Sequence, residues 1–189
     1  MAILADHVSE GASSDLTRSV RVFAPVNQNI RIAPLCTYCS METWTVKSNR
    51  SIPPVTVIPV LIYPDVRQAV EWLGQAFGFK ERLQIGENHR AQLKVGDGAV
   101  ILAEASSNRR PPNPGELTHQ IMVRVEDASA HYQQAHDFGA RILMDPTDFP
   151  YGERQYVAED LAGHQWVFTE TLADVDPNDW GGLLKESED

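Results

Sequence analysis

The sequence has little of what usually identifies a function at once. It contains 2 cysteines, and its 189 residues hold no long hydrophobic run. A membrane-spanning helix needs roughly 18 or more consecutive apolar residues, so we expect no membrane association. Basic residues are also in deficit: 26 acidic against 16 basic side chains give a net charge of −10 and a pI near 5.0. Because binding to nucleic acid depends on basic side chains that neutralise phosphates, we expect no nucleic-acid partner.

The familiar catalytic motifs are missing as well. There is no G-x-S-x-G nucleophile motif and no glycine-rich phosphate loop. The two cysteines form a single C-x-x-C pair, Cys36 and Cys39. Such a pair is typical of half a zinc site or of a redox dithiol. Zinc would need two further ligands, and no second C-x-x-C follows, so the pair does not by itself assign a function.

The two ends of the chain differ from its centre. Residues 1–53 show no sustained apolar periodicity, and we interpret them as a flexible N-terminal extension. The first residues lack the basic start and long apolar core of a secretory signal, which favours a cytoplasmic protein. Residues 170–189 hold seven acidic side chains against one lysine. We interpret 173–189 as an acidic tail whose charges are solvated.

Between these ends, one pattern occurs twice. A β-branched run over 55–63 predicts a buried strand, Asp65 is typical of a helix N-cap, and Gly78 of a helix end. Asp127 and Gly139 repeat the last two features 62 and 61 residues later, after a second predicted strand. The strands predicted after the two helices cover 79–85, 89–95 and 99–105 in the first copy, and 140–144, 154–158 and 164–169 in the second.

This repeat predicts an α+β fold of two βαβββ modules. We place module one at 54–106, a linker rich in proline at 107–116, and module two at 117–172. The strands should form a curled mixed sheet around a central cup, with the helices on the outside. A concave cavity of this kind is where small ligands bind.

Two segments of the second module resemble a known family. They are PYGER at 150–154 and DLAGHQWVF at 160–168. Together with the repeat, they resemble the vicinal oxygen chelate superfamily, which includes glyoxalase I, bleomycin-resistance proteins and extradiol dioxygenases. The resemblance covers about residues 54–182. It implies the paired-module fold, a small-molecule ligand in the cup and a homodimer.

The resemblance also implies where metal ligands would lie, on the first and last strand of each module. The matching positions are Gln120, Ile58, Leu102 and Val167. Only Gln120 can coordinate a metal, although Glu104 and Glu170 lie nearby in the sequence. We therefore expect no cofactor; if a divalent metal is present, its expected ligands are Glu104, Gln120 and Glu170.

Strand alternation predicts which side chains line the cup. Two loop aromatics and Arg154 in the segment 145–154 either cover the cup or form a turn, with Arg154 paired to Asp145 or Asp148. Trp166 belongs either to the core or to a stacking wall of the cup. The complete set of predicted ligand-binding residues is Ile58, Val60, Ile62, Gln120, Met122, Arg124, Phe149, Tyr151, Arg154 and Trp166.

Three functions remain open at this point. The first is a protein of the bleomycin-resistance type that binds a planar or aromatic molecule in the cup without a complete catalytic metal site. The second is a metal-dependent lyase or isomerase of the glyoxalase type. The third is a non-catalytic interaction or scaffold domain whose cup is filled by its own side chains. The missing ligands favour the first.

Overall fold

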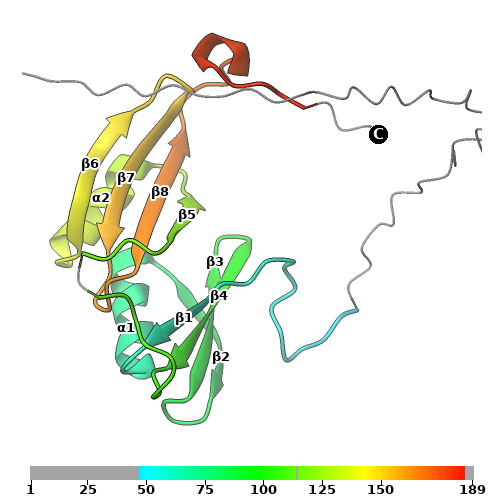
Figure 1. Ribbon diagram of the computed structural model, residues 1–189, viewed down its shortest axis with the longest axis vertical. Coiled ribbons are helices and arrows are strands. Elements are labelled where there is room, and N and C mark those ends of the chain that lie inside the picture. Colours follow the sequence, from blue (N-terminus) through cyan, green and yellow to red (C-terminus); the bar gives the residue numbers. More distant parts are fainter. Residues whose placement is uncertain (1–46, 114, 186–189) are drawn as a thin grey trace, which may run out of the picture. The chain divides into compact units, whose positions relative to one another are not determined.

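A computed structural model of the chain describes residues 47–113 and 115–185 (Figure 1). Most of the expected N-terminal extension, the pair Cys36 and Cys39, and the last four residues of the acidic tail lie outside the described residues. The helices of the described part are all too short or too polar to cross a membrane.

Module one contains a four-stranded mixed sheet and one helix. The strand order is β1-β4-β3-β2, with β1 parallel to β4 and the other neighbours antiparallel. The elements are β1 (Val60–Tyr63), α1 (Val66–Phe77), β2 (Lys80–Ile85), β3 (Arg90–Val95) and β4 (Gly98–Glu104). The predicted strand over 55–63 is wrong at its start, because the paired strand begins only after Pro59, a residue without an N–H to donate to a sheet.

Module two repeats this arrangement with the order β5-β8-β7-β6, and β5 is parallel to β8. Its elements are β5 (Gln120–Arg124), α2 (Ala128–Asp137), β6 (Arg141–Asp148), β7 (Glu153–Glu159) and β8 (Gln165–Thr171), followed by the short 3-10 helix η1 (Pro177–Trp180). The loop predicted at 145–154 is wrong in its extent. β6 continues to Asp148 through a register shift after Met144, which accommodates Pro146 on this edge strand.

Both helices begin and end where local chemistry predicts. The Asp65 carboxylate accepts a hydrogen bond from the Gln68 backbone N–H at 3.0 Å, and Asp127 accepts one from Ala130 at 2.8 Å. These bonds satisfy N–H groups that the first helical turn leaves without partners. Gly78 ends α1 with a φ of 70°, a conformation that glycine adopts without strain.

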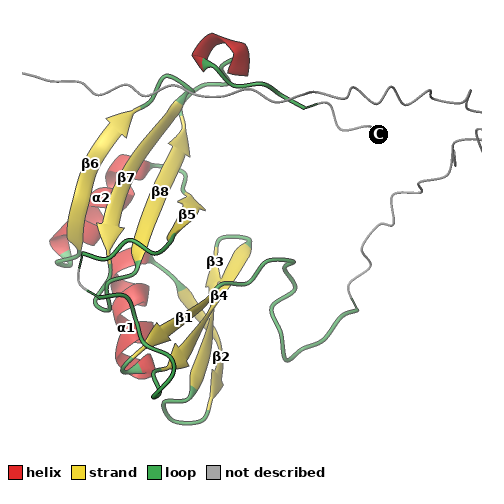
Figure 2. Ribbon diagram, viewed as in Figure 1, coloured by secondary structure: helices red, strands yellow, loops and turns green. Residues whose placement is uncertain are grey.

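The two helices lie on one side of the two sheets, and we call the opposite faces, which neither α1 nor α2 covers, the open faces (Figure 2). The core lies on the helix side, where Phe77 of α1 contacts Trp166 and Phe168 of β8. Trp166, Phe168 and Tyr156 are fully buried there. Because α1 belongs to module one and β8 to module two, the two modules share one apolar core.

The predicted α+β class and the two βαβββ modules are confirmed, and the sheet is divided in two. In the described residues, the edge strands β1 and β5 pair within their own modules and not with each other. A buried polar cluster joins the modules instead. The Asp160 carboxylate in module two accepts a hydrogen bond from the Tyr63 hydroxyl of β1 at 2.6 Å. The His164 ring lies 2.9 Å from the carbonyl oxygen of Ile62.

Candidate functional site

The open faces of the two sheets carry most of the side chains predicted to line a cup. On β1, Val60 is 51% exposed, whereas its neighbours Leu61 and Tyr63 are buried on the helix side. On β5, Gln120, Met122 and Arg124 are exposed and alternate with half-buried residues. Ile62 is half-buried, as is Ile58, which precedes β1. The alternation thus separates the two faces as the sequence predicts.

A hydrogen-bonded polar network lies on β7 and β8 on the open face of module two, and its members Gln155 and Thr169 are buried. The Glu153 carboxylate accepts hydrogen bonds from the hydroxyls of Thr169 at 2.5 Å and Thr171 at 2.7 Å. The bond from Thr169 is the main reason why the pKa of Glu153 is lowered, so this group is ionised at neutral pH. Gln155 donates to Thr169, and Tyr151 to Gln155 at 3.3 Å.

Glu153, Gln155 and Thr169 were not predicted as site residues. The pairing register of β5, β7 and β8 would have identified them. In this register Thr169 pairs with Arg124 on β5 and with Gln155 on β7. Residues that pair across a sheet share a face. Thr169 and Gln155 therefore lie on the same face as the predicted Arg124, and Glu153 shares it because it stands two residues before Gln155 on the same strand.

One cavity of about 320 Å³ has walls from both modules, and we call it the cup pocket. Module one supplies the segment before β1 and the turn between β3 and β4, including Val57, Pro59 and Ala99. Module two supplies the free edge of β5, with Met122 and Arg124 from its open face and Ile121 and Val123 from its helix side. Val57 is 79% exposed and Met122 is 60% exposed. Within the part of the chain that the structure describes, the Arg124 guanidinium makes one hydrogen bond, of 3.4 Å, to the Thr171 hydroxyl.

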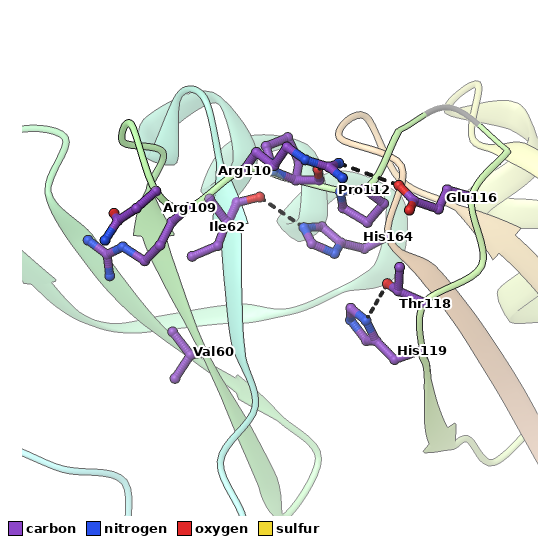
Figure 3. A pocket seen from close by; sticks show the side chains of 11 residues that line it. Val60, Ile62, Arg109, Arg110, Pro112, Glu116, Thr118, His119 and His164 are labelled. Carbon is purple, nitrogen blue, oxygen red and sulfur yellow. Dashed lines mark hydrogen bonds and ion pairs between the residues drawn. The ribbon is translucent and has the colours of Figure 1, made fainter.

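A second cavity of about 390 Å³ lies between β1, the linker and the start of β8, and we call it the linker pocket (Figure 3). Its lining includes Val60, Ile62, Arg109, Arg110, His119 and His164. The two pockets share no lining residue. The predicted cup residues are therefore divided, since Val60 and Ile62 line the linker pocket whereas Met122 and Arg124 line the cup pocket.

The loop residues and Trp166 lie elsewhere. Arg154 forms a bidentate ion pair with Asp148, at 2.6 and 3.0 Å. This pairing matches the alternative in which the segment 145–154 forms a turn. Trp166 is in the core, and its indole N–H donates to Asp160 at 3.0 Å. Phe149 stacks on Tyr151 with ring centres 5.2 Å apart, and Trp180 of η1 packs against the edge of Tyr151.

The structure does not bring the three candidate metal ligands together. Glu170 accepts a hydrogen bond from the Ala128 N–H at the start of α2, at 2.9 Å. Glu104, at the end of β4, accepts one from Asn88. Gln120 lies on the opposite, open face and donates to Gln165. Within residues 47–113 and 115–185, no group of three or more His, Cys, Asp or Glu side chains is placed to hold a metal ion.

Comparison with known proteins identifies the family. The model of the glyoxalase/bleomycin resistance protein/dioxygenase superfamily matches residues 52–168. The crystal structure of TioX from Micromonospora sp. ML1 is 34% identical, with a TM-score of 0.53, over 62% of this chain and 99% of that chain. A superfamily member from Nocardioides shares the fold at 17% identity and a TM-score of 0.53, over 75% of this chain and 93% of its own. An uncharacterized protein of Mycobacterium bovis is 24% identical over an alignment of 127 positions that covers 62% of this chain and 84% of that protein. The chain belongs to the glyoxalase/bleomycin resistance protein/dioxygenase superfamily.

Proposed function

We propose that this protein binds a small planar molecule in the cup pocket between its two modules, without a complete catalytic metal site. The observation that carries the proposal is the lining of that pocket. Exposed apolar side chains of both modules, Val57 and Met122, border the same cavity of about 320 Å³. Small-molecule sites are typically concave, mostly apolar and bordered by a few polar groups.

The apolar lining would provide most of the affinity. Burial of apolar surface is worth roughly 25 cal/mol per Å², and a flat ring that covered Val57 and Met122 would bury surface on both walls at once. The thioether of Met122 adapts to ligands of different shape and makes favourable contacts with aromatic rings. An aromatic ligand therefore fits this lining better than a sugar or a phosphate ester would.

Arg124 would provide orientation. Among the described residues, its one side-chain hydrogen bond is long, and the ionised Glu153 attracts it from beyond ion-pair distance, so the guanidinium can turn toward a ligand. A planar guanidinium stacks on aromatic faces and donates to carbonyl or anionic groups. Asp97, in the turn of module one, is the acidic group in the same lining, and it favours ligands that also offer a hydrogen-bond donor.

The proposal is tested by a thermal-shift screen of planar aromatic compounds, followed by calorimetric titration of those that raise the melting temperature. Arg124→Gln should weaken binding of such a compound by about tenfold while leaving the melting temperature of the free protein unchanged, because Arg124 is exposed. Arg50→Gln, at another exposed arginine outside both pockets, is the matched control. The proposal fails if no planar compound binds saturably, or if Arg124→Gln binds it as tightly as the Arg50 control.

A further inference from the structure

The hydrogen bond to Ile62 identifies which ring nitrogen of His164 is the donor. Its Nε2 atom lies 2.9 Å from the carbonyl oxygen of Ile62, which can only accept a hydrogen bond. Nε2 therefore carries the proton, and in a neutral imidazole the other nitrogen, Nδ1, is then an acceptor. His164 is 3% exposed, and its Nδ1 has no hydrogen-bond partner among the described residues. Burial of an acceptor without a hydrogen-bond donor costs free energy. A donor from a bound molecule would recover that cost at Nδ1.

His164 is one of the residues that line the linker pocket, and its Nδ1 atom is buried at the wall of that pocket. Figure 3 shows the ring of His164 between the Ile62 carbonyl and the pair formed by Thr118 and His119. The Nδ1 atom of His119 lies 2.9 Å from the Thr118 hydroxyl, and the two imidazole rings are 5.8 Å apart. The pocket thus has a polar side, on which His164 provides a fixed acceptor.

The rest of the lining adds positive charge and apolar surface. Arg110 is paired with Glu116 at 3.4 Å, whereas Arg109 takes part in none of the ion pairs of the described residues. Val60, Ile62 and two linker prolines provide apolar walls. The Arg109 guanidinium therefore has no ion-pair partner among the described residues, although the chain has a net charge of −10. Such a guanidinium is suited to bind a carboxylate.

We propose that the linker pocket is a second binding site, which takes a small organic acid that also carries an O–H or N–H donor. Figure 3 shows Ile62 between Arg109 and His164, with the Arg109 guanidinium turned away from His164. In the proposed complex the exposed Arg109 side chain turns across Ile62 to hold the carboxylate, His164 Nδ1 accepts the hydrogen bond of the donor, and the body of the ligand packs on Val60 and Ile62. The site is independent of the proposed cup ligand, because the two pockets share no lining residue.

The test uses three related sets of probes with the full chain in calorimetric titrations: the three isomeric hydroxybenzoates, the corresponding methoxybenzoates, and phenol. Hydroxybenzoates contain both groups, methoxybenzoates lack the donor, and phenol lacks the carboxylate. At least one hydroxybenzoate should bind saturably at a site that Arg109→Gln weakens and Arg124→Gln, in the cup pocket, does not. Its methoxy counterpart and phenol should each bind about tenfold more weakly or worse.

Two variants assign the two contacts. Arg109→Gln should weaken the best hydroxybenzoate about tenfold and leave phenol unchanged. His164→Gln keeps an N–H near the Ile62 carbonyl, but its acceptor oxygen lies one bond farther from Cβ than Nδ1 does. The variant should therefore reduce the preference for the hydroxy over the methoxy compound. Arg50→Gln is the matched control. The proposal is overturned if no hydroxybenzoate binds saturably, if methoxybenzoates bind equally well, or if Arg109→Gln binds hydroxybenzoate as tightly as the control does. If His164→Gln fails to fold, the comparison of hydroxy and methoxy compounds in the native chain still decides the role of the donor.

Discussion

The substitution Asp160→Asn should destabilise the protein strongly, because the Asp160 carboxylate joins the two modules. Its Oδ2 accepts hydrogen bonds from the Tyr63 hydroxyl and the Trp166 indole, and its Oδ1 accepts from the backbone N–H groups of Ala162 and His164. Tyr63 and Trp166 are fully buried, and Asp160 is 6% exposed. Burial, reinforced by the neighbouring Asp160, raises the pKa of Tyr63 well above its usual value, so its hydroxyl remains a donor.

The size of the effect follows from what an amide can and cannot accept. Asparagine has one acceptor oxygen, so its NH₂ group must face one of the two pairs of donors. If that pair is Tyr63 and Trp166, the hydroxyl can rotate to accept, but the Trp166 N–H loses its partner inside the core. A buried donor without a partner costs about 1–3 kcal/mol. The remaining hydrogen bonds also become weaker, because they now go to a neutral amide and no longer to an ionised carboxylate. Together these effects should lower the free energy of unfolding by about 2–5 kcal/mol. Proteins of this size have free energies of unfolding of about 5–15 kcal/mol.

The assay is urea unfolding followed by tryptophan fluorescence, together with a thermal melt. The melting temperature should fall by roughly 10 °C. Tyr63→Phe is the matched control, because it removes a single donor and leaves Asp160 with three others; it should cost about 1 kcal/mol. The double variant should lose less than the sum of the two, since both changes remove the same hydrogen bond. An Asp160→Asn protein within 0.5 kcal/mol of the native free energy of unfolding would refute this reasoning.

Three further predictions concern other parts of the molecule. Gly152→Ala should lower the free energy of unfolding by more than about 2 kcal/mol, because the new Cβ would lie 2.2 Å from the Ala173 oxygen and φ is +82°. Urea unfolding measures this loss. The control is Gly115→Ala, which has a similar φ of +77° but no such contact. Burial lowers the pKa of His131, so the unfolded chain binds this proton more readily, and stability should fall as the pH drops below about 6.5. Melts at successive pH values should show this loss, which His131→Gln should reduce; an unchanged pH profile would contradict the role of His131. Sedimentation velocity should give twice the chain mass of 21.1 kDa, as the family resemblance implies, and a monomer at all concentrations would contradict the homodimer.

Much of the fold follows from local features of the sequence, which is why it could be predicted. Asp65 and Asp127 cap the helices through bonds that span three residues, and such bonds depend on nearby residues alone. The exposed face of β5 follows from alternation in the same way. The bounds of strands were less certain, because β6 extends past Pro146 only by pairing with β7, which the local sequence does not reveal.

The role of the segment 160–168 could not be predicted, because its partners are distant in the sequence. Asp160 was noted only as part of a family signature, yet the residue that it binds, Tyr63, lies 97 positions earlier. The donor role of His164 Nε2 depends on the Ile62 carbonyl, which lies 102 positions away in the sequence. Likewise, the division of the predicted cup residues between two pockets results from how the linker packs beside β1, and no periodicity encodes that packing.

The central claim, that a ligand lies between the modules against Met122, is tested most directly by methyl NMR of methionine. The Met122 methyl resonance can be assigned by its disappearance in Met122→Leu, and it is then followed while a planar compound found in the screen is titrated into the native chain. The account predicts a large, saturable shift of this resonance, with Met144 of β6 shifting less because it does not line the cup pocket. A compound that binds saturably while the Met122 resonance stays in place would contradict the account.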